Sequence, residues 1–265
     1  MPDLPVTLEA RGIFHMTKDE TDESIAAFAK AAEQPNASAL AHYGLAVMRF
    51  HQARQTDGIT PELLLELESR LVSSLETNAR FTPAAARLAE VYRRMDGGRT
   101  DRALTVSRIA VALEPDNTDY RLLEARILRE SGQQDEAQAI VRREADAMTS
   151  QGAARLNHLC WQGALWGFAE TVLASCDQAV GQQPDNSAFL DSRGVARALT
   201  GDLEGALADL RSALSGEGAE DWTEELRSIR EAWVAELAQG KNPFAENGHV
   251  ALAENPLHDG VGWLR

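Results

Sequence analysis

The sequence has few of the features that cross-link a small fold or place it in a membrane. It contains two cysteines, Cys160 and Cys176, which are too few for a framework of disulfides. Its most apolar stretch, 156–174, is interrupted by His158, Gln162 and Glu170 and cannot span a bilayer. No basic start followed by an apolar run occurs at residues 1–9, so we expect no secretory signal and a cytoplasmic location.

Positive charge is also scarce. The chain has 41 acidic and 26 basic residues, a formal net charge of -15, and its lysines are limited to Lys18, Lys30 and Lys241. Such a balance repels phosphate backbones and anionic lipid headgroups, which argues against nucleic acid and against a membrane as partners. With 44% hydrophobic residues the chain can still bury a core, so we expect a folded protein.

The sequence does contain an internal repeat. Gly132, Gly167 and Gly201 begin three similar segments and lie 35 and 34 residues apart. Pro-Asp-Asn occurs at 115–117 and again at 184–186, each time before a new helical pattern. The apolar period between these breaks is that of a helix, with no convincing two-residue alternation. Each segment is therefore predicted to form two antiparallel helices that bury their apolar faces by stacking on neighbouring pairs.

This pattern resembles the tetratricopeptide repeat, which has small residues at its eighth, twentieth and twenty-seventh positions. The resemblance implies an all-α fold, a right-handed α-solenoid of about six helix-turn-helix repeats in residues 1–220, with a capping helix at 221–240 and a tail at 241–265. The segment 230–244 resembles an extension of bacterial members of the family. The aligned repeats are 5–38, 37–81, 82–117, 118–152, 153–186 and 187–220, and their eighth positions are Gly12, Gly44, Ala89, Ala125, Cys160 and Gly194.

Two departures from the repeat have structural consequences. The second repeat is about eleven residues too long, and the surplus around 54–61 predicts a loop, with Thr60 and Pro61 starting the next helix. Leu67 and Val172 replace a small residue at the twentieth position, so helix spacing is expected to widen there.

No motif for catalysis or for binding a metal or cofactor is present. The six histidines form no His-Glu-x-x-His motif, and Gly97-Gly98 lacks the Gly-Lys-Ser/Thr that completes a phosphate loop. Cys160 and Cys176 occupy interior positions of the repeat and are predicted to pack close together as thiols. We therefore expect no catalytic residue, no metal, no cofactor and no enzymatic activity.

In proteins of this family the first helix of each repeat lines a concave groove that binds peptides or helices. Carried over by position, the resemblance implies a groove with an apolar N-terminal part, a band of arginines in the middle and a C-terminal part of mixed polarity. Residues 80–130 hold ten arginines and eight acids, and arginine's planar fork suits carboxylates. Trp166 is expected in the core. The predicted lining is Ile13, Met16, Leu45 and Met48, then Arg49, Glu90, Arg93, Arg94, Arg126 and Arg129, then Asn157, Trp161, Leu165, Asp191 and Val195.

The arginines also have a simpler interpretation as surface ion pairs with Glu90, Glu124 and Glu130, each worth only tenths of a kcal/mol, roughly. The leading hypothesis is a non-catalytic scaffold or adaptor that binds a partner protein or peptide in the groove, through an acidic segment or a C-terminal carboxylate. The alternative is a regulatory or sensor subunit of a bacterial effector enzyme, a protease or nuclease. It would associate through its outer face or its acidic C-terminal helix, since 202–236 holds ten acids and three arginines.

Overall fold

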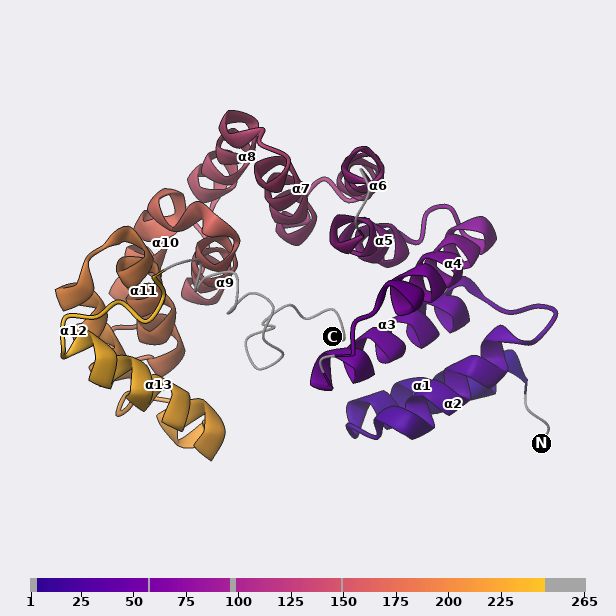
Figure 1. Cartoon of the computed structure of the whole chain (residues 1–265), viewed down its shortest axis with the longest axis horizontal. Helices are drawn as coiled ribbons and strands as arrows, with labels where there is room; N and C mark the ends of the chain where they lie inside the picture. Colours follow the sequence, from indigo (N-terminus) through magenta and orange to yellow (C-terminus); the bar gives the residue numbers. More distant parts are fainter. Residues whose placement is uncertain (1–3, 57, 96–98, 149, 246–265) are drawn as a thin grey trace. The chain divides into compact units, whose positions relative to one another are not determined.

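The computed structural model describes residues 4–56, 58–95, 99–148 and 150–245, and the regular structure in them is helical (Figure 1). This confirms the predicted all-α class. The chain divides into two compact units, Met1–Ile127 and Leu128–Arg265, and the boundary falls within helix α7 (Thr118–Glu130). None of the described helices is long and apolar enough to cross a membrane.

The N-terminal unit is built from consecutive helices that pack as pairs, α1 on α2, α3 on α4 and α5 on α6. Each pair also packs on the next, through α2 with α3 and α4 with α5. Stacked helix pairs are the arrangement that the repeat predicts. The bounds are α1 (Pro5–Thr17), α2 (Thr21–Ala32), α3 (Ala39–Gln55), α4 (Pro61–Thr77), α5 (Thr82–Arg94) and α6 (Thr100–Leu113).

The surplus residues of the second repeat lengthen both helices and also form the loop between them. Helices α3 and α4 have 17 residues each, against 13 in α5. Thr60 is the N-cap of α4, where its hydroxyl accepts from Leu63 N at 3.2 Å, and Pro61 follows at the first helical position. The start of the second helix therefore agrees with the prediction, while Arg54 and Gln55 belong to α3 because its helical pattern continues through them.

Phe28 on α2 sets the spacing of the first three helices. Its ring is buried, and a Cβ built on Gly12 of α1 or on Gly44 of α3 would lie less than 3 Å from it. Leu45 and Met48 pack in the same core, so these two residues, predicted for the apolar part of a groove, are buried instead. Glycine at both positions allows the aromatic ring to lie between two helices, and burying that ring contributes about 1.5–3 kcal/mol.

The C-terminal unit is also built from helix pairs, with α9 packed on α10 and α11 packed on α12. Gly132 and Gly201 end α7 and α11 with φ of 85° and 90°, a left-handed conformation that glycine adopts without strain. A short π-helical turn, η1, joins α9 to α10. The bounds are α8 (Gln134–Ala147), α9 (Ala153–Gly163), η1 (Ala164–Phe168), α10 (Ala169–Gln182), α11 (Ser187–Thr200), α12 (Leu203–Ala213), the 3-10 turn η2 (Ala219–Asp221) and α13 (Glu224–Leu237).

Helices α9 and α10 are joined covalently. Cys160 and Cys176 form a disulfide with a Cα–Cα distance of 5.0 Å. Both residues are buried, so the prediction that they lie close together inside the repeat is correct, but the prediction of separate thiols is wrong. The two cysteines occupy facing positions on the paired helices α9 and α10, close enough to bond. Their separation of 16 residues along the chain does not by itself reveal this.

Val172, which replaces a small residue, is compensated on the facing helix. A Cβ on Gly163 of α9 would lie 2.5 Å from Val172 Cγ1, so the missing side chain of Gly163 makes room for the larger residue. In this helix pair the small residue therefore lies on α9, as Gly163, and the larger one on α10, as Val172.

Helix α13 packs against α12 and is tied to α11 by a buried ion pair. Arg230 donates to both carboxylate oxygens of Asp191 at 3.1 and 2.8 Å, and the Arg230 side chain is only 3% exposed. Its Cζ lies 4.6 Å from the ring centroid of Trp233 and 5.8 Å from that of Trp222. Two aromatic faces and a bidentate carboxylate therefore fix the orientation of this helix. The described part of the tail ends at residue 245, so the rest of the predicted tail, 246–265, lies outside the described residues.

Candidate functional site

The N-terminal unit gathers four arginines around one carboxylate. Arg93 donates through Nε and Nη2 to Glu90 at 2.9 and 2.8 Å, and Arg94 donates through Nε at 2.9 Å. The three residues lie three and four positions apart on α5, a spacing that places them on one helix face. Arg87 and Arg126 also interact electrostatically with Glu90. We call Arg87, Arg93, Arg94 and Arg126, with Glu90 at their centre, the arginine cluster.

The arginine cluster is unusually well buried for charged groups. Arg87 and Arg126 are 5% and 6% exposed, and Glu90 is 7% exposed. Burial alone would raise the pKa of Glu90, but Arg93, Arg94 and Arg126 outweigh it and hold that pKa well below its usual range. Burial also lowers the pKa of Arg87. The carboxylate is thus ionised at neutral pH, and it is one negative charge shared among several cations.

An aromatic ring of α3 supports two of these cations. The Cζ atoms of Arg87 and Arg94 lie 5.2 and 5.3 Å from the ring centroid of Phe50, which is itself buried. Guanidinium groups at this distance are attracted to the face of the ring. Phe50 therefore helps to hold the cluster in place without adding negative charge.

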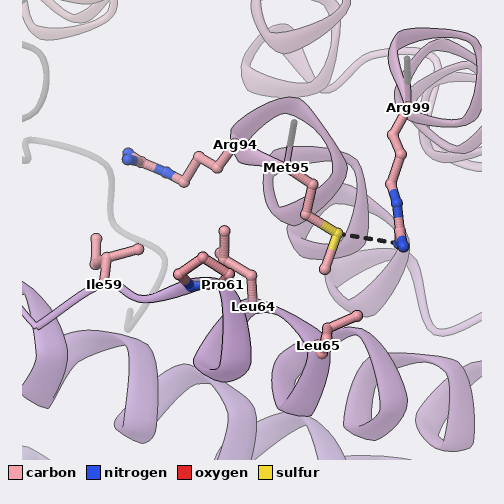
Figure 2. Close-up of a pocket in the computed structure, with 7 residues that line it drawn as sticks. All are labelled: Ile59, Pro61, Leu64, Leu65, Arg94, Met95 and Arg99. Carbon is pink, nitrogen blue, oxygen red and sulfur yellow. Dashed lines mark hydrogen bonds between the residues drawn. The ribbon is translucent and has the colours of Figure 1, made fainter. Parts of the chain in front are cut away.

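An open pocket of about 590 Å³ adjoins the arginine cluster. Figure 2 shows Arg94 extending over Ile59 and Pro61, with Arg99 on the other side of Met95. Arg99 Nη1 donates to Met95 Sδ at 3.1 Å and forms an ion pair with Glu68 of α4. We call this space the apolar pocket, and it is lined by Ile59, Pro61, Leu64, Leu65, Arg94, Met95 and Arg99.

Arg94 belongs to both features. Its side chain is 16% exposed, so its guanidinium contacts Glu90 and still forms part of the pocket wall. Leu65 is 53% exposed on the pocket's other wall. An apolar side chain of a ligand can be buried in the apolar pocket while a neighbouring carboxylate of the same ligand approaches Arg94.

The predicted arginines separate into three environments. Arg93, Arg94 and Arg126 lie together in the arginine cluster. Arg49 instead pairs with Glu66 on α4 at 3.1 Å, and both side chains are more than a third exposed, so this pair contributes little. Arg129 belongs to the C-terminal unit, where its guanidinium lies against Gly167.

The residues predicted for the C-terminal part of the groove lie in the C-terminal unit. Asn157 and Trp161 are half-buried on α9, and Trp166 is buried in η1. The Asp191 carboxylate is already bonded to Arg230 of α13. Helix α13 thus occupies the position at which an external cation would meet Asp191.

Sequence reasoning missed several residues of the site. Arg87 lies three positions before Glu90 on the same helix, and that spacing is a signal that could have identified it. Ile59, Leu65 and Arg99 carry no such signal, because Ile59 lies in a loop, Leu65 lies on α4 and Arg99 precedes α6.

The described residues include no group of three or more His, Cys, Asp or Glu side chains that could hold a metal ion. The arginine cluster and the apolar pocket likewise contain no nucleophile paired with a general base.

Comparisons with known proteins agree on the repeat. A family model described as tetratricopeptide repeat matches residues 78–152. A thermophilic tetratricopeptide repeat protein of Thermus thermophilus is 16% identical, with a TM-score of 0.50 over 86% of this chain and 98% of that one. A tetratricopeptide repeat protein of Parabacteroides merdae is 12% identical, with a TM-score of 0.59 over 85% and 82%. No curated protein gives a significant sequence match. These solved structures are similar to the chain in fold.

Proposed function

We propose that this chain is a non-catalytic tetratricopeptide repeat scaffold whose N-terminal unit holds an acidic and apolar segment of a partner protein. Stacked helix pairs present extended, preformed binding surfaces with little rearrangement. The family fold supports protein interaction in general, and the choice of partner chemistry comes from the site.

The observation that carries the proposal is the position of Arg94 between the arginine cluster and the apolar pocket. Several cations surround Glu90, and Arg94, which also lines the pocket, is the one that a carboxylate of a bound segment would meet. The adjoining pocket has the apolar walls and the volume to accept a leucine-sized side chain. A segment in which an acidic residue neighbours an apolar one matches both parts.

The test uses a short fluorescein-labelled peptide with glutamates beside leucines, and a matched peptide with glutamine in place of glutamate. We expect saturable binding of the first peptide by fluorescence anisotropy, weakened by salt and by Arg94→Gln by about tenfold, since losing one charge-assisted contact costs about 1.4 kcal/mol or more. Leu65→Ser should weaken it as well, because Leu65 is exposed and lines the pocket.

Arg80→Gln is the matched control, because Arg80 is an exposed arginine of the same unit and does not line the pocket. It should leave affinity unchanged. Equal binding of the glutamate and glutamine peptides, or full affinity in Arg94→Gln, would contradict the proposal.

A second candidate function rests on the outer surface of α13. Glu224, Glu225, Glu231 and Glu236 are all exposed there and could meet a basic surface of an enzyme that the chain regulates. An arginine-rich peptide distinguishes the two proposals. Its binding should depend on Glu231 and Glu236 and be indifferent to Arg94 if α13 is the interaction surface.

We also propose a cytoplasmic location. The oxidation state of Cys160 and Cys176, which form a disulfide in this structure, tests it. Disulfides persist in oxidising compartments and are rare in the cytosol. Trapping thiols in rapidly quenched source cells decides the matter, since two oxidised cysteines would argue against the cytoplasm.

A further inference from the structure

A second pocket, of about 260 Å³, lies wholly within the C-terminal unit. It forms where the end of α7, the start of α8, the η1–α10 junction and the end of α11 meet. We call it the turn pocket, and it is lined by Arg129, Gln134, Gln138, Ala164, Gly167, Phe168, Ala169, Glu170, Thr171 and Leu199.

The cation of the turn pocket differs from three other partly or fully buried arginines of its unit. Arg193 and Arg197 both donate to Asp209, at 2.7 and 2.8 Å, and Arg230 donates to Asp191 at 2.8 Å. Among the described residues, none accepts a hydrogen bond from Arg129 or forms an ion pair with it, and its Nε is shut off from solvent. A guanidinium that has lost part of its hydration without gaining a counter-charge is stabilised by any anion that reaches it.

Gly167 provides the surface on which this guanidinium lies. A Cβ on Gly167 would overlap the Arg129 Cζ, and the residue has a φ of 86°, which a side chain would strain. Glycine is therefore needed at position 167 for two reasons: its positive φ in the π-helical turn and the close approach of the Arg129 guanidinium. The rest of the turn surrounds the cation and supplies no acceptor to it.

The other polar groups of the turn pocket suit an anion. Gln134 and Gln138 lie four residues apart on one face of α8, and each carries a side-chain amide that can donate. Thr171 contributes a hydroxyl. Glu170, the acidic residue among those that line the pocket, is exposed, and no ion pair joins it to Arg129 within the described structure.

We propose that the turn pocket binds an oxyanion, either phosphate or the carboxylate of a peptide, with Arg129 as the cation and the glutamines as additional donors. Planar carboxylates and phosphates match the guanidinium fork, and the volume admits a group of that size with its immediate substituent. This site is separate from the arginine cluster and the apolar pocket, so each proposal can fail without the other.

The test is a titration of the full chain with inorganic phosphate at constant ionic strength, followed by NMR of the side-chain amides of Gln134 and Gln138. We expect saturable shifts in the unaltered chain and an affinity reduced by about tenfold or more in Arg129→Gln. Arg129→Lys, which keeps the charge without the fork, should lie between the two.

Arg142→Gln is the matched control, because Arg142 is exposed on α8 and does not line the pocket. It should bind phosphate like the unaltered chain, and circular dichroism shows whether each variant is folded. The proposal is overturned if the unaltered chain gives no saturable shift, or if Arg129→Gln binds as well as the control.

Two further probes distinguish the sources of the anion. A tripeptide with a free C-terminal carboxylate and its C-terminal amide are titrated in the same way. Stronger binding of the free acid than of phosphate identifies the end of a protein chain as the ligand class, and stronger binding of phosphate identifies the free ion or a phosphorylated group.

Discussion

Glu90 is a buried carboxylate that interacts with Arg87, Arg93, Arg94 and Arg126. Arg93 and Arg94 hold it through three hydrogen bonds, and its pKa lies well below the usual 4.5 because of them. Removing such a carboxylate leaves buried cations without compensation, which costs more than the ion pair contributes when intact. The residue therefore controls the stability of α5 and the position of Arg94 in the apolar pocket.

We predict that Glu90→Gln lowers the free energy of unfolding by about 3 kcal/mol at pH 7. Because the folded pKa is depressed, the stabilisation by Glu90 is complete above the unfolded value of 4.5 and is lost as pH falls through the folded value. The difference between the two proteins should therefore shrink below about pH 4.5 in urea unfolding experiments. Glu76→Gln, at an exposed glutamate of α4, is the control, and a difference that is constant with pH would refute the prediction.

At the scale of the elements, helices could be predicted from sequence but the contacts between them only in part. Gly132 and Gly201 mark helix ends because a left-handed residue has a local signature. The bond between Cys160 and Cys176 and the pair of Arg230 with Asp191, 39 residues apart, have none. Both depend on which faces of two helices meet, and a single sequence reports that only through repeat positions.

We predict that reducing the disulfide lowers the free energy of unfolding of the C-terminal unit by about 3 kcal/mol, the expected effect of opening a loop of about 15 residues. The measurement is urea unfolding followed by circular dichroism, with and without reductant. The double variant Cys160→Ala, Cys176→Ala should show no response to reductant. Two titratable thiols in the unreduced, denatured protein would show that the bond is absent.

For the molecule as a whole, the net charge of -15 is an average over different surfaces. Arg93, Arg94 and Arg126 surround Glu90 in the N-terminal unit, and Arg129 lies against Gly167 in the C-terminal unit. The boundary between the two compact units falls between Ile127 and Leu128, inside α7. Sequence periodicity continues across that boundary and gives no sign of it.

The division into two compact units predicts that reducing the disulfide affects the C-terminal unit alone. Hydrogen exchange measured by mass spectrometry should show faster exchange in peptides of the C-terminal unit on reduction, and unchanged exchange in peptides of 4–127, because each unit has its own core. Loss of protection in both units would show that they unfold together.

The two units also differ in their chromophores. The three tyrosines, Tyr43, Tyr92 and Tyr120, all lie in the N-terminal unit, and all five tryptophans lie after residue 128. Tryptophan emission excited near the red edge of its absorption thus reports on the C-terminal unit alone, and Trp222 and Trp233 beside Arg230 make it sensitive to the docking of α13. Near-ultraviolet tyrosine bands report on the N-terminal unit, so the protein carries a separate optical label for each half without any added dye.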